Sequence, residues 1–282
     1  MTNAIDRRRC VALLAGGAMS SAMSGTIFTS ARAAAAAEPR IDAARLQATL
    51  EQLSTYGRRA GGSFADGVSR VAYSDADVAG RAYVMGLMRE AGLAPRIDAA
   101  GNISGTRAGS DPSLKPIVIG SHIDSVPGGG NFDGQLGSMA AIEAVRVLNE
   151  HHLATRHPLE VTLWSNEEGG PIGSSAVVEA IPAELLERRF NGVPMREGLL
   201  KIGGDPDHLA RARRAPHSLH CYLELHIEQG GILEKAGIAI GVVDGIVSID
   251  EYDVEVKGFA NHAGTTPTVS YTHLTLPTKR IV

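Results

Sequence analysis

The sequence contains only two cysteines, Cys10 and Cys221, among its 282 residues. Two cysteines can build neither a disulfide framework nor a cysteine-rich zinc site, so a metal would have to be held by histidine and carboxylate side chains. Aromatic residues make up only 4% of the chain, and the net charge is −4 with Lys and Arg scattered along it. Without a basic stripe, nucleic acid is not an expected partner.

The rest of the composition is typical of a soluble α/β enzyme, with 44% hydrophobic and 21% charged residues and 33 glycines. A chain of this length can bury a substantial core, or one core and part of a second.

The first residues resemble an export signal rather than part of a fold. Three arginines at 7–9 precede a weakly apolar stretch at 11–23 and a small-residue tract at 31–37. This pattern predicts a signal over residues 1–37 and an exported or periplasmic protein, and the paired arginines favour the twin-arginine route. A disordered basic leader is the alternative. A membrane anchor is not expected, because the apolar stretch is shorter than the ~20 residues that a span needs.

Hydrophobic periodicity predicts alternating helices and strands along the mature chain. Helices are predicted over residues 41–53, 75–91 and 136–148. Strands are predicted from the apolar run 117–119 and from the alternating segment 159–164. This order favours an α/β fold with a mostly parallel sheet, in which ligands bind beyond the carboxyl ends of the strands.

Polar residues gather among glycines where these strands are predicted to end. The clusters are Gly120 to Ser125, Gly128 to Gly134, Asn166 to Gly170 and Glu224 to Gly230. Each cluster alone could be a solvated loop or a structural histidine. Together they place imidazole and carboxylate groups at one edge, where burial would cost several kcal/mol unless a cation is present. Such ligands suit zinc, manganese or similar divalent ions.

The ordered motifs make the chain similar to the hydantoinase/carbamoylase family of zinc-dependent amidohydrolases. The resemblance covers roughly residues 41 to 267. Besides the four clusters, its motifs are Tyr73-Ser74-Asp75, Ala99 to Asn102 and Asn261 to Pro267. The resemblance implies a di-zinc exopeptidase-like catalytic domain with a mostly parallel sheet, followed by the start of an α+β lid and dimerisation domain.

The resemblance also implies a role for each candidate residue. It implies two divalent ions per site, with Zn²⁺ favoured and Mn²⁺, Co²⁺ or Ni²⁺ possible. Asp133 would bridge the ions, and the other metal ligands would be His122, Glu168 and His226.

Three further residues take catalytic roles by the same resemblance. Glu167 would be the general base, and Asp124 would accept a hydrogen bond from His122 and fix its tautomer. His262, from the lid, would donate to the oxyanion and could reach a partner subunit's site; a locally packed turn histidine is the alternative. Spacing alone does not distinguish Glu167 from Glu168.

The resemblance divides the chain into an incomplete catalytic domain at 38–244, the start of the lid at 245–267 and a segment at 268–282 that does not resemble the family. We expect 268–282 to be an artefactual tail, and a chain ending there to be inactive alone. Ser248-Ile249 also stands where many members have a Gly-Gln pair that touches substrate. This departure bears on the substrate class and leaves the metal chemistry unaffected.

The predicted function is hydrolysis of a linear amide C–N bond, removing a carbamoyl or ureido group from an N-carbamoyl-amino acid or an allantoate-like small molecule. A homodimer formed through the lid is expected, with no nucleic-acid or membrane partner. The alternatives are an aminoacylase or dipeptidase of the same superfamily, and a non-catalytic binding module that keeps the fold. A general base beside a metal ligand counts against a binding module.

Overall fold

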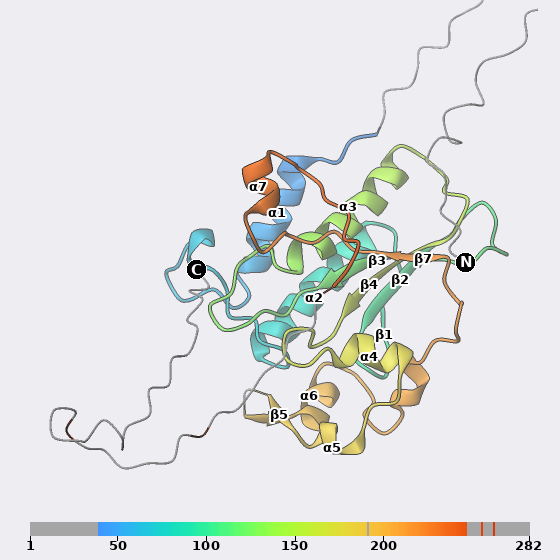
Figure 1. Cartoon of the computed structure of the whole chain (residues 1–282). Helices are drawn as coiled ribbons and strands as arrows, with labels where there is room; N and C mark the ends of the chain where they lie inside the picture. Colours follow the sequence, from blue (N-terminus) through green and yellow to red (C-terminus); the bar gives the residue numbers. More distant parts are fainter. Residues whose placement is uncertain (1–38, 191, 247–254, 256–261, 263–282) are drawn as a thin grey trace, which may run out of the picture. The chain divides into compact units, whose positions relative to one another are not determined.

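The computed structural model describes residues 39–190, 192–246, 255 and 262 (Figure 1). The chain divides into two units, Met1–Ile227 and Glu228–Val282. The predicted signal at 1–37 and the segment 268–282 lie outside the described residues, as does most of the predicted lid segment. The division into domains therefore stays a prediction.

A five-stranded sheet forms the centre of the first unit, with strand order β1-β2-β4-β3-β7. Its strands are β1 (Arg96–Ile97), β2 (Ile103–Arg107), β3 (Ile117–His122), β4 (Leu159–Trp164) and β7 (Cys221–Leu223). β3 runs parallel to both β4 and β7, whereas β2 runs antiparallel to β4 and β1 antiparallel to β2. The sheet is thus mixed, and the parallel part bears the polar clusters. The predicted α/β fold class is confirmed.

The three predicted helices are present, and their ends follow the local chemistry. They are α1 (Ala43–Ser54), α2 (Asp75–Glu90) and α3 (Gln135–Glu150). At the start of α2, the Ser74 hydroxyl accepts a hydrogen bond from the Asp77 backbone N–H. Beyond its end, Gly92 adopts a φ of 79°, in the left-handed region that glycine reaches at little cost.

These helices bury one face of the sheet. Leu53 of α1, Met88 of α2 and Val145 of α3 pack with Ile103 and Val161 of the sheet in one cluster. Figure 1 shows shorter helices on the other side of the sheet. They are α4 (Ile172–Val178), α5 (Ala183–Leu186) and α6 (Met195–Lys201), accompanied by the β5–β6 hairpin (Arg189–Phe190, Val193–Pro194). Their own core includes Ile172, Met195 and Leu199.

The described part of the second unit contains the short helix α7 (Ile232–Ala236). The Glu228 carboxylate accepts hydrogen bonds from the backbone N–H groups of Ile232 and Leu233, and so satisfies donors at the start of that helix. Across the described parts of both units, no helix has the length and apolarity needed to cross a membrane.

Candidate metal centre

β3 carries His122 to the carboxyl end of the sheet. The strand continues three residues past the apolar run predicted from the sequence, and its last residue, His122, pairs with Trp164 of β4. The His122 side chain is only 2% exposed. Its Nδ1 lies 3.1 Å from the carbonyl oxygen of Asp124. A carbonyl oxygen can only accept, so Nδ1 carries the proton and Nε2 presents a lone pair.

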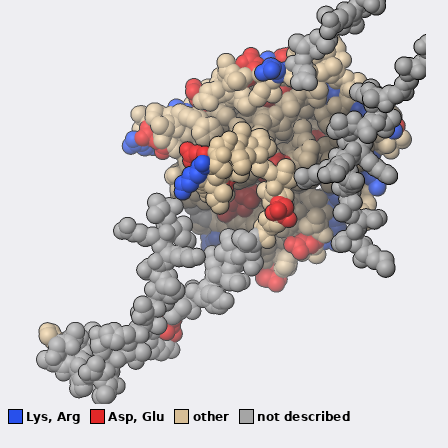
Figure 2. Space-filling view, turned by 45° about the horizontal axis from the view of Figure 1, so that its top comes forward, with Lys and Arg blue, Asp and Glu red and all other residues tan. Residues whose placement is uncertain are grey.

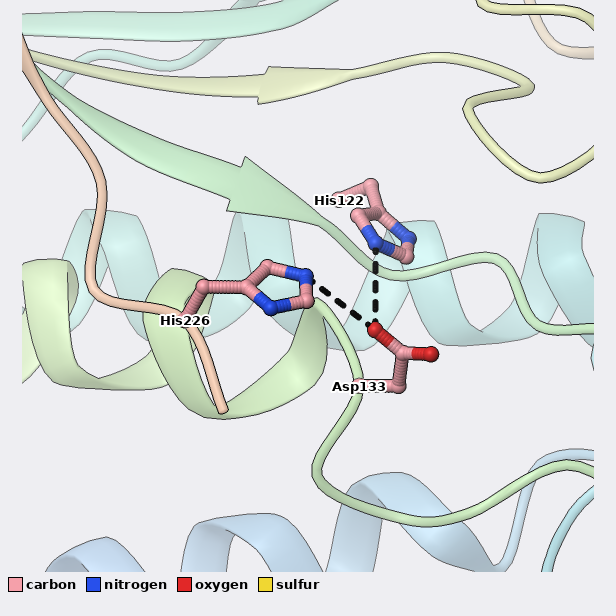
Figure 3. Close-up of side chains that lie close together, drawn as sticks. All are labelled: His122, Asp133 and His226. Atoms are coloured by element: carbon pink, nitrogen blue, oxygen red, sulfur yellow. Dashed lines mark ion pairs between the residues drawn. The ribbon is translucent and has the colours of Figure 1, made fainter. Parts of the chain in front are cut away.

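Asp133 and His226 meet His122 from two other segments (Figure 3). Asp133 lies in the loop before α3, and His226 follows β7. One oxygen of Asp133, Oδ1, is 3.1 Å from Nε2 of His226 and 3.9 Å from Nε2 of His122. One ligand atom from each residue lies within 4.8 Å of the other two. The structure therefore brings together three of the four predicted metal ligands.

The hydrogen bonds of the two histidines show what this cluster requires. Nδ1 of His226 lies 2.9 Å from the carbonyl oxygen of Ile227, so its Nε2 also presents a lone pair. Two lone pairs thus face one anionic oxygen and repel it unless protons or a cation lie between them. Protonating both rings would place an extra charge on the buried His122. A divalent cation satisfies all three groups, so these residues fit a zinc-type ion.

A glycine beside Asp133 makes room for the His122 ring. Gly134 has a φ of 72°, and a Cβ added there would lie 2.3 Å from two atoms of that ring. Any larger residue would displace the imidazole from the cluster. The glycine-rich cluster Gly128 to Gly134 therefore ends in a turn whose shape leaves space for this imidazole.

The two neighbouring glutamates occupy different positions. The Oε2 atom of Glu167 lies 3.5 Å from Nε2 of His122, and its side chain is 42% exposed. Glu168 lies outside the cluster of three ligands, and its backbone N–H donates to the Asp124 carboxylate at 3.1 Å. Burial and the negative charge of Asp133 raise the pKa of the Glu168 carboxyl. The assignment of base and ligand within this pair stays a prediction.

Asp124 is buried behind His122 but contacts it differently from the sequence-based expectation. Its backbone carbonyl accepts the hydrogen bond from His122, while the nearest carboxylate oxygen is 3.7 Å from Nδ1. Burial raises the pKa of Asp124 to about 6. The main chain of Asp124 therefore fixes the tautomer of His122, and the role of its carboxylate in catalysis stays a prediction.

The loop that carries the glutamates is anchored by Asn102, whose role the sequence did not indicate. The side-chain oxygen of Asn102 accepts from the Ser165 N–H at 3.0 Å, and its amide nitrogen donates to the Gly173 carbonyl at 2.9 Å. Asn166, which follows Ser165 in the chain, has a φ of 48°. This backbone conformation costs free energy for most residues, and asparagine tolerates it. The strained backbone delivers Glu167 to the edge of the site.

A fully buried arginine, Arg70, holds the loop after β3 in place through hydrogen bonds to main-chain carbonyls. Its guanidinium donates to the carbonyl of Ile123 at 2.7 Å and to the carbonyls of Leu53 and Tyr56, each at 2.9 Å. Its backbone also exchanges hydrogen bonds with Ser125. Burial lowers the pKa of Arg70 to about 10, opposed by the nearby carboxylates. No sequence pattern distinguished this arginine from a surface one.

His262 belongs to the second unit, and the positions of the two units relative to each other are not described. Its predicted part in binding the oxyanion stays a prediction.

Comparison with known proteins identifies the family. Residues 118–277, more than half of the chain, match the sequence pattern of peptidase family M20/M25/M40. The chain belongs to this family. The M20 match contains His122, Asp133, Glu167, Glu168 and His226, and it runs to residue 277, beyond the predicted boundary at 268.

Individual M20 relatives narrow the assignment. The chain is 41% identical over 233 residues to the N-carbamoyl-L-amino acid amidohydrolase of Geobacillus stearothermophilus. The aligned residues cover 80% of this chain and 56% of that protein. The chain is 37% identical over 238 residues to the ureidoglycolate hydrolase of Arabidopsis thaliana, covering 79% and 49%. The predicted resemblance is confirmed: this M20 protein is a member of the hydantoinase/carbamoylase amidohydrolases.

A solved structure agrees with this assignment. The chain superimposes on a hydantoinase/carbamoylase family amidase from Burkholderia ambifaria with a TM-score of 0.61 and 38% identity, covering 71% of this chain and 48% of that one. The chain spans about half the length of the relatives it matches.

Proposed function

We propose that this protein is a metal-dependent hydrolase that cleaves the linear amide C–N bond of an N-carbamoyl-amino acid or a ureido compound. The observation that carries the proposal is the pair of Nε2 lone pairs, from His122 and His226, turned toward Asp133 Oδ1. Membership of the amidohydrolase family supports the reaction class, and the relatives are named for carbamoyl and ureido substrates.

The ligands divide between two ions in this proposal. His122, Asp133 and His226 would hold the first ion, because their ligand atoms converge. Asp133 and Glu168 would contribute to the second, because Asp133 lies close enough to Glu168 that its negative charge adds to burial in raising the pKa of the Glu168 carboxyl. Bound divalent ions polarise a carbonyl group and lower the pKa of water from about 15.7 to about 7.

Glu167 moves the proton in the proposed reaction. Its partly exposed carboxylate lies beside Nε2 of His122, where a water molecule between substrate and ligands would be within reach. It takes a proton as the water oxygen bonds to the carbamoyl carbon, and returns it to the nitrogen as the C–N bond breaks. The same carboxylate therefore acts first as base and then as acid.

The substrate class is tested by a direct comparison of substrates. In a chain extended over the full length of its relatives and loaded with Zn²⁺ or Mn²⁺, we expect N-carbamoyl-L-amino acids or ureido compounds to be hydrolysed faster than N-acetyl-amino acids or dipeptides. The release of free amino acid and ammonia measures the rate. Preferential cleavage of acyl or peptide substrates would contradict the proposal and favour an aminoacylase or dipeptidase.

A further inference from the structure

The segment that carries His226 leaves the sheet before it reaches the site. The ladder between β3 and β7 ends at the pair Ile119 and Leu223, whereas β3 itself continues to His122. Glu224 and Leu225 lie between the end of this ladder and His226, whose side chain is 34% exposed. Contacts other than the ladder must therefore fix the separation between the two histidines.

Glu224 makes these contacts. One oxygen of its carboxylate accepts a hydrogen bond from the Ser121 hydroxyl, and the other accepts from the Tyr222 hydroxyl at 2.6 Å. Ser121 is fully buried on β3 and directly precedes His122. The carboxylate thus links Ser121, the neighbour of His122, to the segment that carries His226 two residues further on.

Two further features hold the same segment. The indole N–H of Trp164 donates to the Tyr222 hydroxyl at 2.8 Å, so the neighbouring strand β4 takes part in the network. On α3, a Cβ added at Gly137 would lie 2.3 Å from the carbonyl oxygen of Leu225. The segment therefore crosses α3 in close contact, with Glu224 fixing one side and the helix the other.

We propose that Glu224 is a positioning residue, which fixes the distance between His122 and His226 and thereby sets the affinity of the metal centre. Both carboxylate oxygens already accept hydrogen bonds from Ser121 and Tyr222, so Glu224 acts through the backbone of its segment rather than as a ligand. This inference rests on the proposed metal-dependent function.

The chain contains a single tryptophan, Trp164, and its fluorescence can report on the network. We would titrate the 282-residue protein with Zn²⁺ against a competing chelator and follow Trp164 emission. We expect Glu224→Ala to raise the zinc dissociation constant about tenfold, in the range known for residues that orient metal ligands. Tyr222→Phe removes only one of the two bonds, so we expect a smaller increase and an altered Trp164 emission.

Glu224→Gln separates position from charge. Its amide can accept from Ser121 and donate to the Tyr222 hydroxyl, which can then donate to the carbonyl of Gly120, 3.2 Å away. We expect this variant to keep its zinc affinity within about threefold of the wild type. The exposed Glu179→Ala is the matched control for loss of a glutamate, and metal-free melting curves show whether each variant is folded.

Each outcome decides the inference. Unchanged affinity in Glu224→Ala would overturn it, and so would an equal loss in Glu224→Ala and Glu224→Gln, because charge rather than position would then be responsible. A wild-type protein without zinc affinity would overturn both this inference and the proposed metal centre. The expected zinc affinities, together with no hydrolysis of carbamoyl substrates by a chain extended over the full length of its relatives, would support the inference and contradict only the proposed reaction.

Discussion

At Asp133 one carboxylate oxygen faces two imidazole nitrogens, and both of these nitrogens present lone pairs. Sequence could indicate these residues, because His122, Asp133 and His226 stand in clusters of glycine and polar residues, and the cluster of His122 directly follows a predicted strand. It could not indicate that both Nδ1 atoms donate to main-chain carbonyls. These two hydrogen bonds depend on how each imidazole is rotated, and they are the reason to infer a cation between the three side chains.

Residues that hold the ligand-bearing segments in place were harder to identify from the sequence. Asn102 fell within a recognised motif, but its hydrogen bonds to Ser165 and Gly173 join segments more than 60 residues apart. Arg70 was not selected at all, and Glu224 began the cluster Glu224 to Gly230 without a role of its own. An arginine or glutamate is usually solvated, and only the fold shows that these two bind partners from other segments.

Replacing Glu167 by Gln tests the role of the exposed glutamate. The amide keeps the size of the side chain but cannot take a proton, so in a chain extended over the full length of its relatives we expect the turnover number to fall about 10²–10⁴-fold. Zinc content should stay at the wild-type level, because Glu167 is not among the three converging ligands. Steady-state kinetics and elemental analysis measure the two quantities. Near-normal turnover, together with full metal content in Glu168→Gln, would show that the two roles are reversed.

At the scale of elements, the long segments were predictable and the short strands were not. α1, α2, α3 and β4 lie within two residues of their predicted bounds, because each is long enough to show its period. β1 and β7 have two and three residues. Such lengths carry no periodicity, so the antiparallel edge and the strand that leads to His226 emerge only from the fold.

Two glycines within helices should respond oppositely to alanine. At Gly137 of α3, an added Cβ would overlap the Leu225 carbonyl, so we expect Gly137→Ala to lower the free energy of unfolding by about 1–3 kcal/mol and to weaken zinc binding. At Gly86 of α2, no atom lies within 4 Å of an added Cβ apart from its chain neighbours and the backbone of its own helix. There alanine should stabilise the protein by roughly 0.5–1 kcal/mol through its higher helix propensity.

Urea unfolding curves of the two variants measure this contrast. Because both changes add a single methyl group within a helix, the helix propensity gained is the same. The difference therefore reports the contacts of the added Cβ with Ser121 and with the segment that carries His226. Equal stabilisation by both substitutions would contradict the close approach of that segment to α3.

For the whole molecule, a metal held by three separate segments should contribute to stability. His122, Asp133 and His226 come together only in the folded chain, so an ion bound there stabilises the native state alone. At a free zinc concentration of 100 times the dissociation constant, the gain is about 2.7 kcal/mol. Urea unfolding with and without a chelator measures it. His226→Ala should abolish most of the difference, and coincident curves for the wild type would contradict the site.

The N-terminal residues lead to a separate prediction about location. We expect residues 1–40, fused to a reporter, to direct export that depends on the paired arginines. Replacing Arg7, Arg8 and Arg9 by lysine keeps the positive charge and removes the twin-arginine pattern, so export should stop. Fractionation of cells measures the reporter outside the cytoplasm. Unchanged export would instead indicate the general secretory route.

In the view of Figure 2, the blue Lys and Arg side chains of the described residues are scattered rather than gathered into one patch. The expected absence of a nucleic-acid partner stays a prediction. The fold and the family were predictable at this scale because many motifs occur in order. The placement of the second unit, and with it the role of His262, depends on contacts that no local pattern encodes.

The central claim is that His122, Asp133 and His226 together hold a divalent ion. Anomalous diffraction from crystals grown with Zn²⁺, recorded on both sides of the zinc absorption edge, tests it most directly. The account predicts an anomalous peak about 2.0–2.2 Å from Nε2 of both histidines and from an Asp133 oxygen. Zinc bound elsewhere, with no peak between these three side chains, would contradict it.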